Sequence, residues 1–117
     1  MAHEISTEPS GNRVRIEVDG TLLADTDNAV LLHEAGLPVR RYLPRADVRM
    51  ELLERTQTST HCPFKGDAEY FSARIGEQLH TDLAWSYPTP LEHRGDIAEL
   101  IAFDDDRVDT VESDLPA

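Results

Sequence analysis

Cysteine is almost absent from this 117-residue chain, since Cys62 is the only one. A single thiol cannot form an internal disulfide and cannot supply the paired thiolates of a cysteine-based zinc site. Long apolar runs are also missing, and none approaches the roughly eighteen residues of a membrane-spanning helix. The first residues carry acids and no apolar segment, so they do not look like a secretory signal. We therefore expect a cytoplasmic protein, stabilised by packing alone, that does not span a membrane.

Basic residues are scarce as well, because 11 Lys and Arg stand against 23 Asp and Glu, for a net charge of −12. A field of that sign repels phosphate backbones. The densest basic group, Arg40, Arg41 and Arg45, suits one anionic group but is too small to follow a nucleic-acid strand. We expect no nucleic-acid partner.

Histidine spacings typical of metal ligands are lacking. The histidines never lie three or four positions apart, and His33-Glu34 lacks the second histidine of a zinc-protease motif. The sequence predicts no metal site and no cofactor.

Alternating hydrophobicity predicts the first element with the least ambiguity. Val14, Ile16 and Val18 alternate with polar residues, and Asp19-Gly20 follows as the dipeptide of a two-residue hairpin turn. Residues 13–26 are therefore predicted to form strand, tight turn and strand.

The remaining pattern favours more short strands and little helix. Further strands are expected at 29–33, 39–43, 55–60, 68–76, 83–88 and 108–111. A turn near Gly76 and residues 79–82 are expected to connect two of these strands, and 97–103 could be a helical turn or a strand. Pro44 would open a short helix that continues to about residue 54. We predict a mainly β protein, a compact antiparallel sandwich, barrel or folded sheet with one or two short helices.

The domain organisation follows from composition. Residues 1–12 are polar and aperiodic and are expected to be a disordered N-terminus. One β-rich domain would cover 13–112, and 113–117 would be a C-terminal tail.

The segment THCPFKGDAEYF, residues 60–71, concentrates the reactive side chains. His61 is next to Cys62, but neighbours in an extended chain point to opposite faces, so we expect His61 not to activate the thiol. Free cysteine is more often a packed core residue than a nucleophile. Lys65 is the only lysine of the chain and lies in a turn, where it could bind an anion or act as a base or Schiff-base nucleophile; an exposed turn lysine is the equal alternative.

Aromatic and acidic residues complete the candidate site. Trp85 and Tyr87 share a parity and would point to one face of a strand, where they could form a pocket wall or a core edge. Phe71 is expected in the core. Three acids, Glu34, Asp47 and Glu69, could pair with Arg41 or Lys65, or with other surface charges.

Four segments, VLLHEAGLPVRRYLPRADV, THCPFKGDAEYF, AWSYPTPL and IAFDDDRVD, occur in the order found in domain-of-unknown-function family 427, which the chain resembles over residues 13–112. The resemblance implies a small β-rich domain whose activity is unassigned. The family pattern falls on Glu34, Arg41, Tyr42, Pro44, Asp47, Val48, Cys62, Pro63, Lys65, Gly66, Tyr70, Trp85, Ser86, Tyr87 and Pro88.

The family is sometimes labelled nucleotidyltransferase-like. That chemistry needs bound metal, and the sequence has no Gly-Ser motif followed by paired aspartates to hold one. The resemblance therefore carries no phosphoryl-transfer prediction for this chain.

These residues lead to one functional hypothesis and one alternative. Arg41, Lys65, Trp85 and Tyr87 would line a pocket for a small anionic or carbonyl-bearing molecule, bound by a monomer or homodimer. Candidate catalytic residues are Lys65 and Cys62, and the candidate ligand-binding residues are Glu34, Arg41, Tyr42, Tyr70, Trp85 and Tyr87. The alternative is a non-catalytic interaction or structural module in which the same residues stabilise turns.

Overall fold

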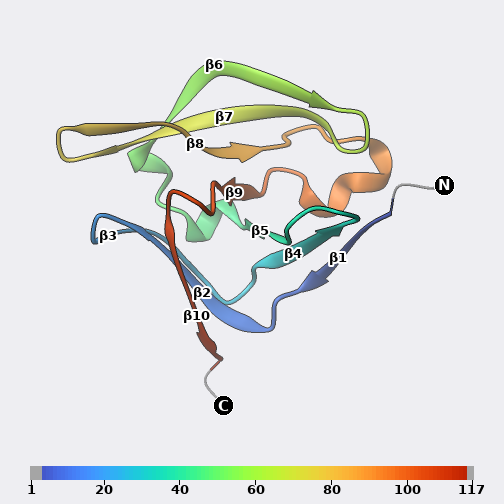
Figure 1. The fold of residues 1–117 in the computed structure, drawn as a ribbon, viewed down its shortest axis with the longest axis horizontal. Coiled ribbons are helices and arrows are strands. Elements are labelled where there is room, and N and C mark those ends of the chain that lie inside the picture. The colour runs from blue at the N-terminus through green and yellow to red at the C-terminus, as the bar shows by residue number, and fades with distance from the viewer. Residues whose placement is uncertain (1–3, 116–117) are drawn as a thin grey trace.

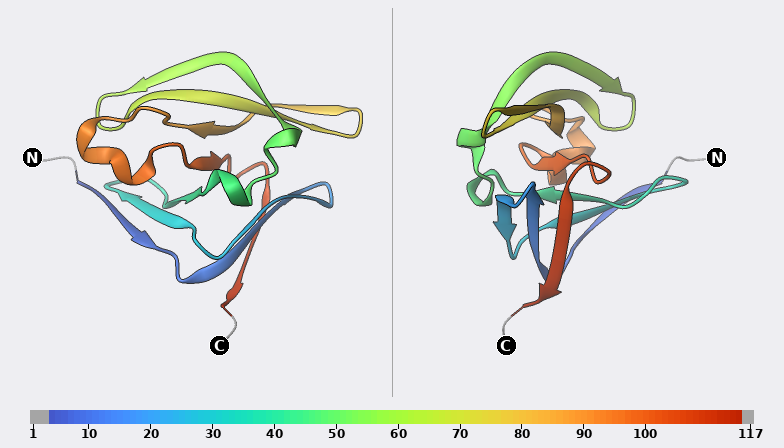
Figure 2. Two further views of the ribbon diagram at one scale, coloured as in Figure 1. Left: turned by 180° about the vertical axis from the view of Figure 1, so that it is seen from behind. Right: turned by 60° about the vertical axis from the view of Figure 1, so that its left-hand side comes forward.

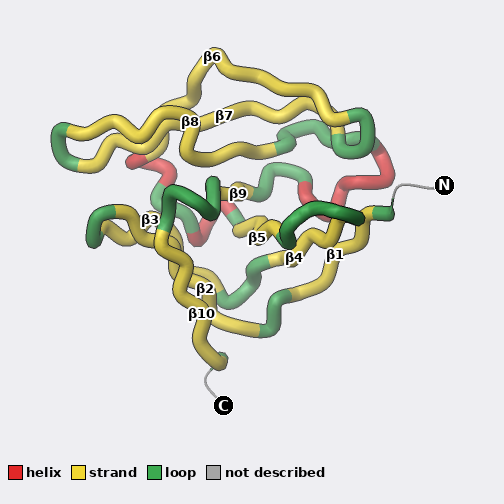
Figure 3. Tube along the Cα trace, in the orientation of Figure 1, coloured by secondary structure: helices red, strands yellow, loops and turns green. Residues whose placement is uncertain are grey.

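The computed structural model describes residues 4–115, with the side chains of all of them except residues 92 and 93. Within that range the chain forms ten strands and three short 3₁₀ helices (Figures 1 and 3). The strands are β1 (Ile5–Pro9), β2 (Asn12–Val18), β3 (Thr21–Thr26), β4 (Val30–Glu34), β5 (Arg40–Leu43), β6 (Leu53–Cys62), β7 (Gly66–Ile75), β8 (Gln78–Ser86), β9 (Ile101–Phe103) and β10 (Asp109–Asp114). The helices are η1 (Arg45–Asp47), η2 (Met50–Leu52) and η3 (Glu92–Ile97).

The strands build two antiparallel sheets. The larger has seven strands in the order β1-β4-β5-β9-β8-β7-β6, and the smaller has three in the order β10-β2-β3. Figure 2 shows the large sheet curving from β6 on one side of the molecule to β1 on the other, with the small sheet beside its lower half. The predicted mainly β, antiparallel fold is confirmed, and the sheets do not close into a barrel. Among the described residues no helix has the length and apolarity needed to cross a bilayer.

The hairpin predicted at residues 13–26 is confirmed as β2 and β3. Val14, Ile16 and Val18 are buried, whereas the residues between them are partly exposed. Asp19 and Gly20 both have positive φ, 50° and 79°, as the two-residue turn requires. Alternating hydrophobicity predicts these strands correctly because one face of the small sheet packs on the large sheet.

Two apolar clusters lie on the two faces of the large sheet. The first fills the space between the sheets, where residues of β2 and β3 pack against Leu43, Phe71 and Ile101. The second cluster lies on the other face, around Tyr42 and Ala102. Because successive side chains of a strand point to opposite faces, Tyr42 and Leu43 belong to different clusters.

The helix predicted after Pro44 is reduced to the two 3₁₀ turns η1 and η2. Val48 lies between them in an extended conformation and pairs with Ala24, and the Arg49 amide donates to the Leu23 carbonyl. Hydrogen bonding to β3 therefore replaces the continuous helical bonds that the local sequence favours.

Three other segments differ from the sequence-based expectation. Ile5–Pro9, within the segment expected to be disordered, forms β1 along β4. The turn expected near Gly76 is confirmed at Gly76-Glu77, but residues 79–82, expected to belong to the connection, are part of β8. Asp109–Asp114 extends the last predicted strand beyond residue 112. In each case a neighbouring strand supplies backbone partners that the local sequence does not reveal.

The edge strand β6 is interrupted. Its pairing with β7 shifts register between Arg55 and Ser59, so three residues of β6 bulge away from the sheet. Figure 1 shows β6 arching above β7. The bulge separates β6 into two short paired stretches.

Candidate functional site

A cleft of about 500 Å³ lies on the face of the large sheet that carries the second apolar cluster. It is lined by Arg40, Tyr42, Lys65, Tyr70, Asp82, Trp85, Tyr87, Asp104 and Asp106. The residues come from β5, β7, β8, the β6–β7 turn and the loop after β9. Five of the eight predicted site residues are among them.

Strand register brings the aromatic side chains together. Tyr70 is opposite Trp85, Trp85 is opposite Ala102, and Ala102 is opposite Tyr42. Residues opposite one another in antiparallel strands share a face, so this row forms one wall. The Tyr70 and Trp85 ring centroids are 6.4 Å apart, and Trp85 Nε1 donates to the Tyr42 hydroxyl at 3.2 Å. Ala102 lies between Trp85 and Tyr42 in this row and is completely buried.

Lys65 reaches the cleft from a tightly held turn. Its amide donates to the Cys62 carbonyl, and its carbonyl accepts from the Leu91 amide. Gly66 has φ +118°, and a Cβ there would lie 3.2 Å from the Pro90 Cα. Only glycine fits this conformation and this spacing without displacement. The Lys-Gly pair therefore positions the lysine against the segment that follows β8.

Lys65 forms an ion pair with Glu34 across the sheet. Nζ lies 2.7 Å from Oε1 of Glu34, and the two side chains are only 12% and 7% exposed. Nζ also lies 5.8 Å from the centre of the Tyr87 ring. The predicted pairing of Lys65 with a nearby acid is thus confirmed for Glu34. An ammonium has three N–H donors, so the contact leaves donor capacity for a ligand.

Burial changes the acidity of two tyrosines at the site. It raises the pKa of Tyr42 to about 12, although the Trp85 hydrogen bond acts in the opposite direction. Burial also raises the pKa of Tyr87 well above its usual value, with smaller contributions from the charges of nearby groups, Tyr42 first. Both hydroxyls are therefore neutral at physiological pH and available as hydrogen-bond donors.

Arg40, and not Arg41, lines the cleft. The Arg40 guanidinium lies 5.5 Å from the Trp85 ring centre and pairs with Asp105 at 3.0 Å. Arg41 pairs with Glu112 of β10, on the opposite face of the large sheet. Side chains alternate between the two faces of the sheet along β5, so Arg40 points to the same face as Tyr42 and Arg41 points to the other. This alternation is the signal that could have identified Arg40 from the sequence.

Cys62 and His61 point in different directions, as predicted. His61 is exposed and bonds to Asp67 through Nδ1 at 2.7 Å. Cys62 is partly buried and packs against the second apolar cluster. No contact joins the thiol to a histidine among the hydrogen bonds of the described residues, so the arrangement is that of a packed cysteine near the cleft.

Three aspartates of the cleft were not anticipated from the sequence. Asp82 has φ 51° at an irregularity in the β7–β8 ladder, and Asp104 and Asp106 follow β9. The Asp104 amide donates to the Leu83 carbonyl, which places the loop after β9 beside Asp82. The run DDD at 104–106 marks this loop in the sequence, but only the β8–β9 pairing brings Asp82 to it.

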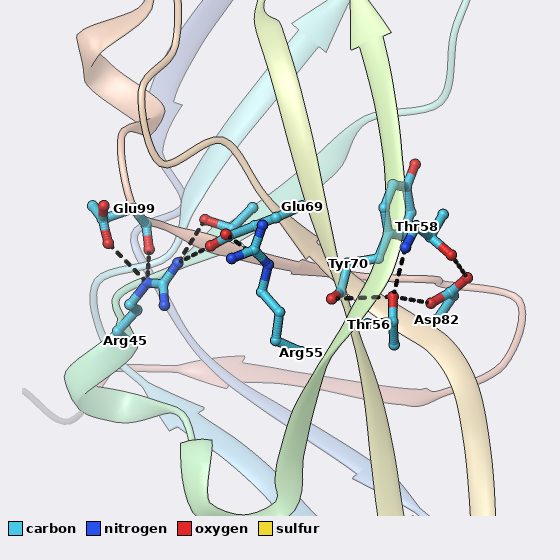
Figure 4. A network of polar contacts seen from close by, with 9 residues as sticks. Arg45, Arg55, Thr56, Thr58, Glu69, Tyr70, Asp82 and Glu99 are labelled. Atoms are coloured by element: carbon cyan, nitrogen blue, oxygen red, sulfur yellow. Dashed lines mark hydrogen bonds and ion pairs between the residues drawn. The ribbon is translucent and has the colours of Figure 1, made fainter.

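Threonines of the bulge in β6 hold Asp82. The Thr56 and Thr58 hydroxyls donate to its two carboxylate oxygens, each at 2.7 Å (Figure 4). Each oxygen retains a lone pair for another donor. The bulge therefore fixes the direction of a carboxylate that lines the cleft.

A second charged cluster surrounds Glu69 and does not line the cleft. Glu69 contacts Arg45 at 3.0 Å and Arg55 at 3.1 Å, and Arg45 also contacts Glu99 (Figure 4). Arg45 donates a further hydrogen bond to the buried Ser86 hydroxyl. Each arginine is already opposite a carboxylate, so the cluster joins η1 to β7 and β8. Its role is structural.

Asp47, another residue of the resemblance, lies outside this cleft and links two elements. It accepts a hydrogen bond from the Thr26 hydroxyl at 2.7 Å and so attaches η1 to β3. Within the described part of the chain, no group of three or more His, Cys, Asp or Glu side chains is arranged to hold a metal ion.

The fold and the cleft together define a mainly β protein with an aromatic, charged cleft on one sheet face. Within that class, the chain belongs to the domain-of-unknown-function family DUF427, whose profile matches residues 6–114. The resemblance seen in the motifs is thereby confirmed, and the match includes β1 and the end of β10. A comparison with curated proteins found no match.

Proposed function

We propose that the cleft binds a small, flat molecule carrying a carbonyl or anionic group, and that Lys65 recognises this group. The observation that carries the proposal is the nearly buried Lys65–Glu34 pair in a cleft walled by Tyr70, Trp85 and Tyr87. Ligand sites commonly combine apolar and aromatic walls with a few convergent polar groups. The cleft has both.

The chemistry favours hydrogen bonding by a fixed cation. Glu34 holds the Lys65 ammonium in place, and limited solvent access strengthens its attraction for a ligand oxygen. The protonated Tyr42 and Tyr87 hydroxyls add neutral polar groups. An ammonium in an ion pair is a poor nucleophile, so the geometry suits polarisation of a carbonyl better than imine formation. Catalysis by Lys65 or Cys62 stays a prediction.

The proposal has a built-in spectroscopic test, because Trp85 is the only tryptophan and lines the cleft. We would titrate the protein with 3-(4-methylphenyl)propanoate and follow Trp85 fluorescence. Saturable binding is expected, with affinity at least about ten-fold lower in Lys65→Met, as for loss of a charge-assisted hydrogen bond. Arg74→Met removes an exposed cation paired with Glu54 and should bind like the wild type.

Lys65→Met also removes the Lys65 charge from its ion pair with Glu34, which is destabilising in a buried position. The double variant Lys65→Met/Glu34→Gln removes both charges and keeps the test valid if the single variant does not fold. Failure to bind in the wild type, or equal affinity in the folded double variant and the wild type, would contradict the proposal.

A structural module is the second candidate, and one contact favours it. The Lys65–Glu34 pair joins the β6–β7 turn to the end of β4, two elements that are not hydrogen-bonded neighbours in the sheet. In this reading the pair holds the curvature of the sheet and Phe64 is exposed for a partner. A thermal midpoint lowered in the double variant, together with no ligand response in the wild type, would support it.

Location and assembly remain proposals of the same kind. We propose that the protein acts in the cytoplasm as a monomer or homodimer, which is supported by its single cysteine and acidic charge.

A further inference from the structure

The charged groups of the cleft are separated along β8. Lys65 lies beside Tyr87, just after the end of that strand, whereas Asp82 is at its middle, next to the loop that carries Asp104 and Asp106. Positions 82 and 87 are five steps apart along the chain, which corresponds to at most about 16 Å in an extended strand. Trp85 lies between the two groups. The cleft therefore has a cationic end, an aromatic middle and an acidic end.

The two ends differ in how far their charges are already neutralised. At the cationic end, Lys65 pairs with Glu34. At the other end, Arg40 pairs with Asp105 and Asp104 lies 3.7 Å from Arg107, but none of the ion pairs among the described residues involves Asp82 or Asp106. The acidic end thus has unused capacity for a cation.

The aromatic middle already accommodates cations. The Arg40 guanidinium lies 5.5 Å from the Trp85 ring centre, and Lys65 Nζ lies 5.8 Å from that of Tyr87. Ring faces attract cations through their quadrupole, most strongly in tryptophan. A ligand cation passing along this wall would therefore meet favourable contacts before reaching the aspartates.

We infer that the cleft selects an elongated zwitterion, with its carboxylate at Lys65, a flat centre against Trp85 and an amine at the Asp82–Asp104–Asp106 end. The inference rests on the proposed function and specifies the class of ligand. Opposite charges at the two ends also fix the direction in which the ligand lies. A molecule with only one of the charges would satisfy only one end.

A set of three matched probes tests this selectivity through Trp85 fluorescence. The zwitterion is 3-[4-(aminomethyl)phenyl]propanoate. The second probe, 3-(4-methylphenyl)propanoate, lacks the amine, and the third, 3-[4-(aminomethyl)phenyl]propanamide, lacks the carboxylate. We expect the zwitterion to bind about five-fold more tightly than either, the effect of one partly exposed ion pair.

A variant locates the origin of the preference. Asp106→Asn removes an exposed carboxylate whose side chain makes no hydrogen bond or ion pair among those found within residues 4–115. It should reduce the preference for the zwitterion over 3-(4-methylphenyl)propanoate, while the affinity for the latter changes by less than about two-fold. Asp109→Asn on β10 removes the same charge away from the cleft and should preserve the preference.

The outcomes separate this inference from the proposed function. Equal affinity for the zwitterion and 3-(4-methylphenyl)propanoate, with both lost in Lys65→Met/Glu34→Gln, overturns the inference and retains the proposed function. Equal affinity for the zwitterion and the amide shows cation binding alone and also overturns it. A preference that is undiminished in Asp106→Asn, or that falls equally in Asp109→Asn, removes the acidic end from the explanation. Absence of any fluorescence response overturns both.

Discussion

Tyr42 connects packing to recognition at the scale of a single residue. It is almost completely buried, accepts the Trp85 indole hydrogen bond and lies in the row that forms the cleft wall. A buried hydroxyl resists ionisation because the phenolate would lose its hydration. The same burial that keeps Tyr42 a neutral hydrogen-bonding group makes its proton a source of stability.

Because the folded state retains this proton, we expect the protein to lose stability at alkaline pH. Burial raises the pKa of Tyr42 to about 12 from 10.0, so the folded state keeps a proton that the unfolded state releases. The contribution is complete below pH 10 and is lost as the pH rises through 12, by up to about 1.4 kcal/mol per pH unit. Urea unfolding across this range should show a shallower decline in Tyr42→Phe than in the wild type. Identical slopes in the two proteins would contradict this origin.

At the scale of single residues, side-chain directions were predictable from the sequence where strand alternation or a local turn determines them. The different directions of the His61 and Cys62 side chains could be predicted from the sequence, because adjacent strand residues point to opposite faces. The same rule applied to Tyr42 would have selected Arg40. The aspartates could not be assigned, since Asp82 and Asp104 meet only through the pairing of β8 with β9.

The turn between β6 and β7 shows how an element positions a functional group. Gly66 adopts a conformation that other residues avoid and lies against Pro90. Gly76, in the next hairpin, also has positive φ, at +61°, but nothing lies within 4 Å of the place where its Cβ would be. A comparison of substitutions at the two glycines therefore distinguishes the cost of a positive φ from the cost of a steric contact with Pro90.

Alanine at these glycines should have unequal effects. Gly66→Ala is expected to lower the free energy of unfolding by about 1–3 kcal/mol and to weaken ligand binding, because Lys65 moves with the turn. Gly76→Ala should cost about 1 kcal/mol and leave binding unchanged. Urea denaturation and the fluorescence titration measure both quantities. A Gly66→Ala protein as stable as Gly76→Ala would show that the turn yields without strain.

Strands were predictable from the sequence where a strand and the strand it pairs with lie in one short segment. The hairpin at 13–26 has its alternation, its turn dipeptide and its second strand in one stretch. β1 was missed because it pairs with β4, and the helix after Pro44 was overestimated because Val48 and Arg49 bond to β3. Local preference gives way in these places to hydrogen bonds with distant segments.

Charge balance acts at the scale of the whole molecule. The chain carries a net charge of −12, and the folded state holds these charges closer together than the unfolded chain. Most of its ion pairs involve exposed side chains and contribute little individually. We therefore expect repulsion among the acidic side chains to outweigh attraction within the ion pairs; salt screens both.

The protein should become more heat-stable as salt is added. Raising sodium chloride from about 0.01 M to about 1 M shortens the screening length from about 30 Å to about 3 Å. We expect the thermal midpoint to rise across this range. A triple variant, Glu77→Gln/Asp109→Asn/Asp114→Asn, removes three exposed negative charges and should show a smaller rise. A midpoint that falls with salt would mean that the ion pairs dominate.

The interruption of β6 also bears on how the molecule behaves beside its own copies. A ten-residue outer strand with continuous free amides and carbonyls is a template on which further strands can add, the first step toward fibrils. The bulge between Arg55 and Ser59 breaks that template, and Thr56 and Thr58 direct their hydroxyls inward to Asp82. One carboxylate thus supports both the cleft and the resistance of the sheet edge to aggregation.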